Sequence, residues 1–299
     1  MDVIGMDIGG TNIKAGIADS KGQLFGEVSV PTPVKEGKEA IIACMKKLIE
    51  ELRVLRPEMI SAIGIGSAGR IDTSAGRVVY ATDNLPGWMG TNLREVIEEA
   101  CSLPVFIDND VNAAAWGEGW LGAAQGSSHY VLVTLGTGVG GALVHNGQLI
   151  NGPRGGAGEV GHLILYPRGT PCNCGQAGCL EQYVSGTALN RLARTVNSDW
   201  NSYDLMKQVA AADPRAIELI DRFAEELATG LISIQNIYDP ERIIIGGGLM
   251  ETHPLWWDRL ASYAVSGTLV NMHIVPAQLG NRAGILGAAR LALDHVTVS

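Results

Sequence analysis

The chain has 299 residues, of which 46% are hydrophobic and 18% are charged. This length and composition are typical of one large or two ordinary globular domains. The formal net charge of −9 argues against nucleic acid as the main partner, because a phosphate backbone requires basic patches. No stretch reaches the roughly 18 uninterrupted apolar residues of a membrane span, and no signal peptide is visible. We therefore expect a cytoplasmic protein that binds no membrane and keeps its five cysteines reduced.

The first half of the chain reads as strands alternating with helices. Residues 3–17 have the pattern of strand, glycine turn and strand, and apolar residues at helical spacing predict a helix over about 36–56. A buried strand is predicted over 60–66, and residues 87–101 read as a loop that enters an amphipathic helix. Residues 104–110 read as a strand with a polar end, and an alanine-rich helix follows.

The opening pattern returns over 130–144, which indicates a duplicated architecture with two related halves. A long helix is predicted over about 214–238, a strand over 242–245 before a third glycine cluster, and an alanine-rich helix over 282–295. This alternation predicts an α/β fold with largely parallel core strands. In such folds ligands bind beyond the carboxyl ends of the strands, so we expect the polar strand ends to converge on one crevice between the halves.

Two glycine turns are candidates for binding a polyphosphate. Glycine lets the backbone approach a ligand closely, and the backbone N–H groups of facing turns could cradle phosphates. Each turn alone is better explained as an ordinary hairpin, and neither matches the P-loop pattern. The matched pair favours phosphate, as does an acid at a strand end, where Mg²⁺ on a phosphate would partner the carboxylate. The residues are Asp7, Gly9, Gly10, Thr11 and Asn12 in the first turn, and Gly136, Thr137 and Gly138 in the second.

The triplet Asp108-Asn109-Asp110 is the best catalytic candidate. A carboxylate at a strand end can accept a hydroxyl proton as general base, and we assign this role to Asp110. Asn109 can both donate to and accept from a sugar hydroxyl. The alternative is a helix N-cap, a position that Asp and Asn favour, and we expect one of the three residues to cap the helix that follows.

One histidine and three cysteines have the spacing H-x9-C-x-C-x4-C, which predicts a tetrahedral zinc site formed by His162, Cys172, Cys174 and Cys179. Four protein ligands leave no position for water, so we interpret the zinc as structural. The alternatives are four unrelated residues or a reactive thiol pair. Glu159 and Glu181 flank the set, and the metal would fix both acids so that they can bind a polar ligand.

Together these motifs resemble the ROK family (repressors, open reading frames, kinases) of bacterial sugar kinases, within the actin/hexokinase-like ATPase superfamily. The combination of GEVGH with CxCGxxGCxE is highly specific. The matching segments follow the family order over nearly the whole chain: DIGGT at 7–11, GSAGRID at 66–72, NLPGW at 84–88, DNDVNAAAWGE at 108–118, LGTGVGGALV at 135–144, GEVGH at 158–162, CNCGQAGCLEQYVSG at 172–186 and IIIGGGL at 243–249.

The resemblance implies a two-domain actin-like ATPase (ribonuclease H-like) fold with duplicated halves of βββαβαβα type. We expect a small lobe over 1–112, completed by the C-terminal helix at about 283–299, and a larger lobe over 113–282 with the zinc-binding loop at 162–179. Many family members are homodimers or homotetramers. Family repressors carry a helix-turn-helix before DIGGT, so with DIGGT at residue 7 we expect no such module.

The resemblance also implies an ATP-dependent kinase that uses Mg²⁺ and a structural Zn²⁺ and phosphorylates a hexose 6-hydroxyl. Asp110 matches the family's general base, and Asp7 would act near Mg²⁺. Asn12 departs from the lysine that many members carry there. The sugar-contact positions fall on Asn84, Asn109, Asp110, Glu159, His162 and Glu181, and the nucleotide loops fall on Gly9, Gly10, Thr11, Asn12, Gly136, Thr137, Gly138 and Gly247.

Glucose is our first choice of substrate, because Glu159 is present beside His162. N-acetylmannosamine, a β-glucoside and fructose remain alternatives, since pocket shape decides among them. Two other classes of protein would use the same motifs differently. A sugar-sensing protein would bind hexose without ATP turnover, and a zinc hydrolase would need an open metal position.

Overall fold

The computed structural model describes residues 1–57, 59–82, 84–267 and 271–296. The chain forms two compact units. Unit 1 comprises Met1–Gly126, Leu149–Ala157 and Gln278–Ser299, and unit 2 comprises Ser127–Gln148 and Gly158–Ala277.

The lobe boundary that we expected after residue 112 needs correction. It would cut helix α3 (Asp110–Leu121), which is continuous and packs against helix α9 (Ala283–Val296) within unit 1. The structure also assigns 149–157 to unit 1. Of the C-terminal helix expected to residue 299, positions 297–299 lie outside the described residues.

Unit 1 contains a five-stranded sheet with the strand order β3-β2-β1-β4-β7. Strand β1 pairs with β2 antiparallel and with β4 parallel, while β2–β3 is antiparallel and β4–β7 is parallel. The core strands are therefore less uniformly parallel than we expected, because the first three strands form a meander. The strands span Asp2–Ile8 (β1), Asn12–Asp19 (β2), Leu24–Pro31 (β3), Ile60–Ser67 (β4) and Val105–Asn109 (β7), beside a hairpin of Arg70–Asp72 (β5) and Arg77–Tyr80 (β6).

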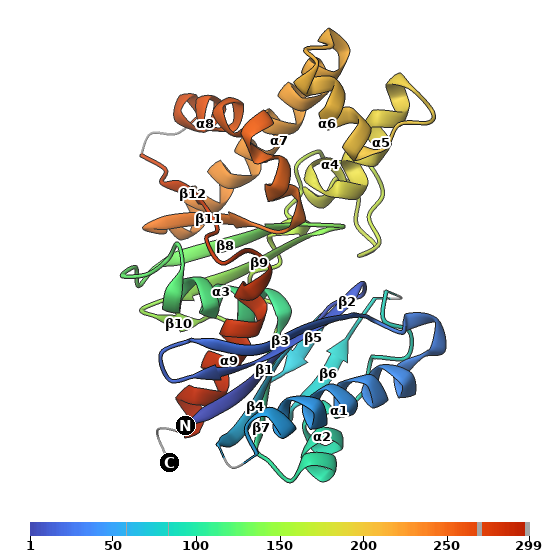
Figure 1. Cartoon of the computed structure of the whole chain (residues 1–299). Coiled ribbons are helices and arrows are strands. Elements are labelled where there is room, and N and C mark those ends of the chain that lie inside the picture. Colours follow the sequence, from blue (N-terminus) through green and yellow to red (C-terminus); the bar gives the residue numbers. More distant parts are fainter. Residues whose placement is uncertain (58, 83, 268–270, 297–299) are drawn as a thin grey trace. The chain divides into compact units, whose positions relative to one another are not determined.

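The two faces of this sheet bury different helices, because side chains alternate along a strand. On β1, Ile4, Met6 and Ile8 join a core cluster with residues of α1 (Lys38–Leu55) and α2 (Leu93–Cys101). The opposite face packs on α9, as Figure 1 shows. There the contact is so close that a Cβ at Gly64 would lie 1.7 Å from Ala288 O. The alanine-rich C-terminal sequence thus forms a helix whose backbone lies very close to the backbone of the sheet.

Unit 2 repeats the arrangement, with the strand order β10-β9-β8-β11-β12. Strand β8 pairs antiparallel with β9 and parallel with β11, which is in turn parallel to β12. In both units a three-strand meander is thus followed by two parallel strands, which confirms the predicted α/β fold with duplicated halves. The strands span Tyr130–Leu135 (β8), Val139–His145 (β9), Gln148–Leu149 (β10), Arg242–Gly246 (β11) and Ile274–Pro276 (β12).

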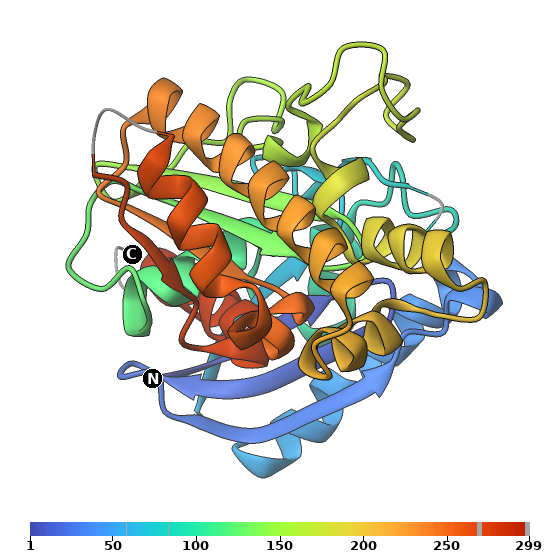
Figure 2. The ribbon, with the colours of Figure 1, turned by 90° about the horizontal axis from the view of Figure 1, so that it is seen from above.

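The helices of unit 2 cover its sheet with one large apolar cluster around α7. Asp213 caps α7 by accepting hydrogen bonds from two backbone N–H groups, and Pro214 occupies its first turn. Figure 2 shows α7 and α8 side by side. The helices of unit 2 are α4 (Glu181–Val184), α5 (Gly186–Val196), α6 (Ser202–Ala210), α7 (Pro214–Tyr238) and α8 (Trp257–Ser266). Unit 2 also has 3₁₀ turns at Val160–His162 (η2) and Gly248–Leu255 (η3), and unit 1 has them at Val34–Glu36 (η1) and Gly280–Arg282 (η4).

Among the described residues, no helix combines the length and apolar character needed to cross a membrane.

Candidate functional site

Asn109 is the residue of the acidic triplet that caps helix α3. Its Oδ1 accepts hydrogen bonds from the N–H groups of Val111 (2.8 Å) and Asn112 (3.1 Å). Its Nδ2 donates to Gly69 O (2.8 Å) and to Asp110 Oδ1 (2.9 Å). Both amide hydrogens are therefore used inside unit 1, and a sugar contact by this amide would have to replace one of these bonds.

Asp108 belongs to a hydrogen-bond network inside unit 1. The side chain is 4% exposed, and its Oδ1 accepts from Asn109 N (2.7 Å) and from Asn112 Nδ2 (2.8 Å). Asn112 Nδ2 also donates to Asn151 Oδ1 (3.0 Å), on the segment that returns to unit 1. Burial raises the pKa of Asp108, and these hydrogen bonds oppose the shift.

Asp110 is the residue of the triplet whose carboxylate keeps an oxygen for chemistry. Within the described residues, hydrogen bonds to its side chain reach Oδ1, from Asn109 Nδ2 and from Val111 N (3.0 Å). Burial, followed by the neighbouring Asp7 carboxylate, raises the pKa of Asp110 to about 7. A carboxylate with a pKa near neutrality is a more effective general base than an ordinary one.

Lys14 lies beside the candidate residue Asp7 and was not among the candidates that we named from the sequence. It lies opposite Asp7 in the β1–β2 register, with Nζ 3.7 Å from Asp7 Oδ2 and 3.1 Å from Asn281 Oδ1. Burial raises the pKa of Asp7, and Lys14 opposes that shift. The signal was present in the sequence, because a tight turn over Gly9–Asn12 fixes which residues of the two strands face each other.

The first glycine turn is a closed hairpin of unit 1, in which Gly9 N donates to Asn12 O over 3.1 Å. Thr32 Oγ1 donates to Gly9 O over 2.7 Å and braces the turn from β3's end. A Cβ at Gly10 would lie 3.3 Å from Asn84 O, so the structure brings Asn84 to this turn. Thr11 at its tip is exposed.

The second glycine turn is a feature of unit 2, braced by the start of α5. Gly186 N donates to Gly136 O over 2.7 Å, and Thr187 Oγ1 donates to Thr137 O over 2.8 Å. Gly247 has φ +90°, and a Cβ there would lie 2.4 Å from Leu135 O. Gly247 therefore lies directly beside this turn.

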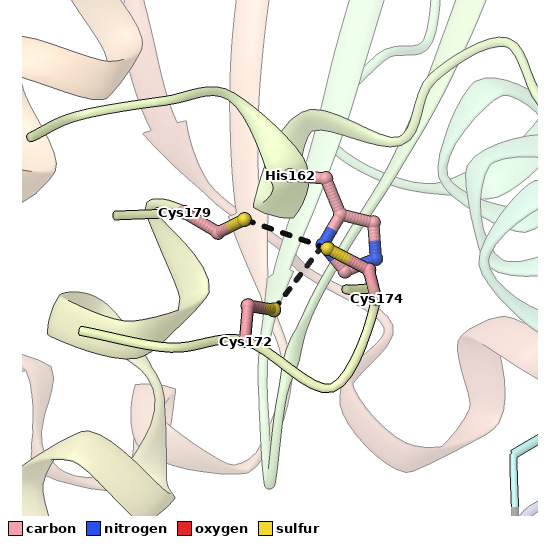
Figure 3. Close-up of side chains that lie close together, drawn as sticks. All are labelled: His162, Cys172, Cys174 and Cys179. Atoms are coloured by element: carbon pink, nitrogen blue, oxygen red, sulfur yellow. Dashed lines mark hydrogen bonds between the residues drawn. The ribbon is translucent and has the colours of Figure 1, made fainter. Parts of the chain in front are cut away.

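The four predicted zinc ligands converge in unit 2 (Figure 3). One ligand atom from each of His162, Cys172, Cys174 and Cys179 lies within 4.8 Å of the others. Cys174 Sγ is 3.6 Å from Cys179 Sγ, and Cys172 Sγ is 3.8 Å from His162 Nδ1. A tetrahedral site with Zn–S bonds of about 2.3 Å has S···S edges of about 3.8 Å, so the set fits zinc.

The pKa values of the clustered thiols shift in opposite directions. Cys174 is slightly desolvated, but hydrogen bonds from Gln176 N and the neighbouring thiols outweigh this and lower its pKa. Burial, followed by the neighbouring Cys174 and Cys172 thiols, raises the pKa of Cys179 to about 12. Three clustered thiols cannot all become thiolates unless positive charge lies among them. A zinc ion would supply that charge, and these side chains could then act as its ligands.

The two acids that flank the candidate metal site are held in different ways. Glu159 Oε2 lies 3.9 Å from His162 Nε2, the ring nitrogen opposite the one that faces Cys172. Glu181 Oε2 accepts a hydrogen bond from Val139 N over 2.9 Å, which ties it to the second glycine turn. Glu159 thus lies beside a candidate metal ligand, whereas Glu181 is hydrogen-bonded to the second glycine turn.

Comparison with known proteins identifies the group to which this architecture belongs. The model of the ROK family matches residues 3–295. The chain belongs to the ROK family. Its relatives include glucokinases of Thermotoga maritima (33% identical, covering 99% of this chain and 98% of the relative) and Streptomyces coelicolor (36% identical, covering 97% of each). An N-acetylmannosamine kinase of Escherichia coli is 31% identical over 99% of each chain.

Solved structures of ROK proteins agree with this assignment. A ROK glucokinase from Streptomyces griseus, solved with glucose and AMPPNP, matches with a TM-score of 0.86 and 32% identity. The match covers 98% of this chain and 100% of that chain. The family assignment and this similarity confirm the two-domain actin-like fold that the motifs implied.

Proposed function

We propose that this ROK protein is an ATP-dependent hexose kinase that transfers the γ-phosphate of ATP to the 6-hydroxyl of glucose. The observation that carries the proposal is Asp110, a carboxylate fixed at the start of α3 whose pKa is raised to about 7. The full-length similarity to proteins named glucokinase supports glucose as the acceptor.

Asp110 acts as the general base in this mechanism. Asn109 Nδ2 and Val111 N bind Oδ1, which orients the carboxylate. The carboxylate accepts the proton of the sugar 6-hydroxyl as the hydroxyl oxygen attacks the γ-phosphorus. The bond from phosphorus to the bridging oxygen of ADP breaks, and ADP leaves with that oxygen. Such transfers depend mostly on positioning and electrostatics.

Asp7, Lys14 and the glycine turns bind the phosphates. Gly10 and Gly138 offer backbone N–H groups to the phosphates, and the Lys14 ammonium offers positive charge beside Asp7. The partly buried carboxylate of Asp7 offers the oxygen ligands that a hard cation prefers. Mg²⁺, when bound there, would neutralise phosphate charge. Thr11, Asn12, Gly9, Gly136, Thr137 and Gly247 complete the proposed nucleotide-binding set.

The sugar is recognised by side chains around the metal centre and by Asn84. His162 directs Nε2 away from the thiols and toward Glu159, so this nitrogen and the carboxylate can bind neighbouring hydroxyls. Glu181 accepts from Val139 N and retains further acceptor capacity for a hydroxyl. Zinc, when bound by His162 and the three cysteines, would supply a structural cross-link. We also assign a sugar contact to Asn109, in exchange for one of its present bonds.

The test is a coupled ADP-release assay of the purified protein with glucose, N-acetylmannosamine, fructose and a β-glucoside. We expect the highest kcat/KM with glucose, and ³¹P NMR of the product should place the phosphate on the 6-hydroxyl. A preference for N-acetylmannosamine would favour the activity named for the Escherichia coli relative. Sugar binding without ADP release from any acceptor would refute the kinase and indicate a sensor.

We further propose that the protein is a cytoplasmic homodimer or homotetramer. Many ROK proteins assemble in this way, and none of the helices described here could span a membrane. Light scattering coupled to size exclusion should give two or four times the chain mass of 31.6 kDa. Cell fractionation should recover the protein with cytoplasmic markers.

A further inference from the structure

The loop that carries the three candidate cysteine ligands is attached to helix α7 at two points. We define the metal loop as residues 163–180, between His162 and α4. Near its start, the Tyr166 hydroxyl donates a hydrogen bond to Glu226 Oε1 over 3.2 Å. At its end, Leu180 packs so closely on the helix that a Cβ at Gly230 would lie 2.6 Å from Leu180 Cδ2.

Both attachment points lie on one stripe of α7. Arg222, Glu226 and Gly230 are spaced four residues apart and therefore share a face of the helix. Arg222 Nε donates to Glu226 Oε1 over 2.9 Å. The Glu226 side chain is only 4% exposed, and such a position is costly for a carboxylate unless partners satisfy it. The Tyr166 hydroxyl and Arg222 are those partners, so the contact to the metal loop is specific.

Tyr166 also fixes the main chain beside a metal ligand. Its N–H donates to Gly178 O over 3.2 Å, and Gly178 directly precedes Cys179. Gly178 has φ +83°, and a Cβ there would lie 1.7 Å from Tyr166 O, so the two backbones are in tight contact. The Tyr166 ring packs edge to face on Tyr183, with centroids 4.9 Å apart. Any displacement of Tyr166 would therefore displace the segment that carries Cys179.

We propose that Tyr166 is a positioning residue, anchored by Glu226 and Arg222, which holds the metal loop in the geometry that retains zinc and orients His162 toward the sugar. This inference rests on the proposed zinc site and sugar site. It assigns a functional role to a stripe of α7 that contributes no ligand itself. Ligand geometry at metal sites is commonly set by hydrogen bonds of this outer kind.

The test compares Tyr166→Phe with the wild type in two measurements. Tyr166→Phe removes only the hydroxyl and keeps the ring that packs on Tyr183. Zinc release to a chelator, followed with a chromogenic indicator, should accelerate by about tenfold. The KM for glucose should rise severalfold while kcat stays within about twofold of the wild type, because Asp110 and the phosphate sites are untouched. Glu226→Gln should shift both quantities in the same direction, and it provides a second variant if Tyr166→Phe does not fold.

The matched control is Tyr238→Phe, which removes a hydroxyl hydrogen bond of 2.6 Å to Val144 O in the same unit. It should leave zinc release and the KM for glucose unchanged. Wild-type zinc release and KM in Tyr166→Phe and Glu226→Gln would overturn the inference. So would an equal fall of Tm in zinc-loaded and zinc-stripped Tyr166→Phe with unchanged zinc release, because the contact would then be purely structural. A wild type that binds no zinc would instead refute the proposed metal site itself.

Discussion

Asp110 lies close enough to Asp7 that the Asp7 charge adds to the effect of burial, and together they raise the pKa of Asp110 to about 7. Asp7 is itself a partly buried acid with a raised pKa, and Lys14 only partly offsets its desolvation. Two neighbouring, partly desolvated acids favour retention of a proton near neutral pH. The general base that we propose is therefore poised to change its ionisation in the pH range where a cell operates.

This relationship predicts how stability depends on pH. The pKa of Asp110 is about 7 in the folded chain against 3.8 for the ordinary group, so between these values the folded chain binds more protons than the unfolded chain. The contribution of Asp110 to the free energy of unfolding should therefore rise as pH falls from about 7 toward 4, by at most about 1.4 kcal/mol per pH unit.

In Asp110→Asn, this dependence of the free energy of unfolding on pH should be lost. Urea unfolding of the wild type and of Asp110→Asn at several pH values, without Mg²⁺ or substrates, gives the comparison. The control is Asp72→Asn, because Ser74 and Ala75 lower the pKa of Asp72 and its stabilising contribution is lost only at lower pH. If wild type and Asp110→Asn had parallel pH profiles between 5 and 7, the raised pKa would be wrong.

The same substitution should separate turnover from sugar binding. Asparagine keeps the size of the side chain and an acceptor for Val111 N, but it cannot accept the hydroxyl proton. We expect kcat to fall by about 10²–10⁴-fold, while the dissociation constant for glucose changes only a few fold. Turnover near that of the wild type would remove Asp110 as the base.

Lys14→Met should weaken ATP use without affecting the sugar. The substitution keeps an extended side chain but removes the ammonium that lies 3.7 Å from Asp7 Oδ2. We expect kcat/KM for ATP to fall on the order of a hundredfold, as when a preorganised charge donor is removed, with the glucose dissociation constant unchanged. Lys21→Met, on the exposed turn that follows β2, is the control. Equal ATP kinetics in both variants would show that Lys14 does not contact phosphate.

Local patterns predicted much of this molecule because short-range geometry decides them. The repeat of strand, glycine turn and strand predicted the duplicated halves. The cysteine spacing predicted the cluster of candidate metal ligands that the structure brings together. The pairing of Asp7 with Lys14 could have been derived in the same way, since a hairpin turn fixes register. No local pattern decides which residue of 108–110 caps α3, because Asp and Asn are comparable caps.

Other features depend on contacts between distant segments and have no local signal. Nothing near Tyr166 indicates that a glutamate 60 residues later accepts its hydroxyl bond. Likewise, the return of 149–157 to unit 1 brings Asn151 into contact with Asn112, which no pattern in the segment predicts. The lobe boundary was misplaced for this reason.

Cys174→Ser tests the metal centre. Serine replaces a soft thiolate with a poor zinc ligand, and Cys174 lies on the exposed side of the cluster, so the core is disturbed little. We expect about one equivalent of zinc in the wild type, less in the variant, and a KM for glucose raised at least about tenfold. Cys44→Ser, on α1 of unit 1, is the control and should retain both. An unchanged KM in zinc-free protein would show that the metal does not shape the sugar site.

A pair of glycine substitutions tests whether Glu181, held by its hydrogen bond to the second glycine turn, binds the sugar. A Cβ at Gly138 would lie 2.3 Å from Glu181 Oε2, so Gly138→Ala must displace the carboxylate that Val139 N binds. At Gly136, two residues earlier in the same turn, a Cβ would meet nothing within 4 Å. Gly138→Ala should therefore weaken glucose binding in the absence of ATP by about tenfold, which corresponds to the loss of one hydrogen bond to a charged group.

Gly136→Ala should leave glucose binding unchanged, because it alters the turn without touching Glu181. Isothermal titration with glucose alone separates this effect from nucleotide binding, to which both glycines belong in our proposal. Glu181→Gln should reproduce the weaker binding seen with Gly138→Ala, and adding it to Gly138→Ala should cost little more, because both changes disrupt one interaction. Full additivity of the two losses would mean that Gly138→Ala acts through the backbone of the turn, and that Glu181 binds the sugar independently of it.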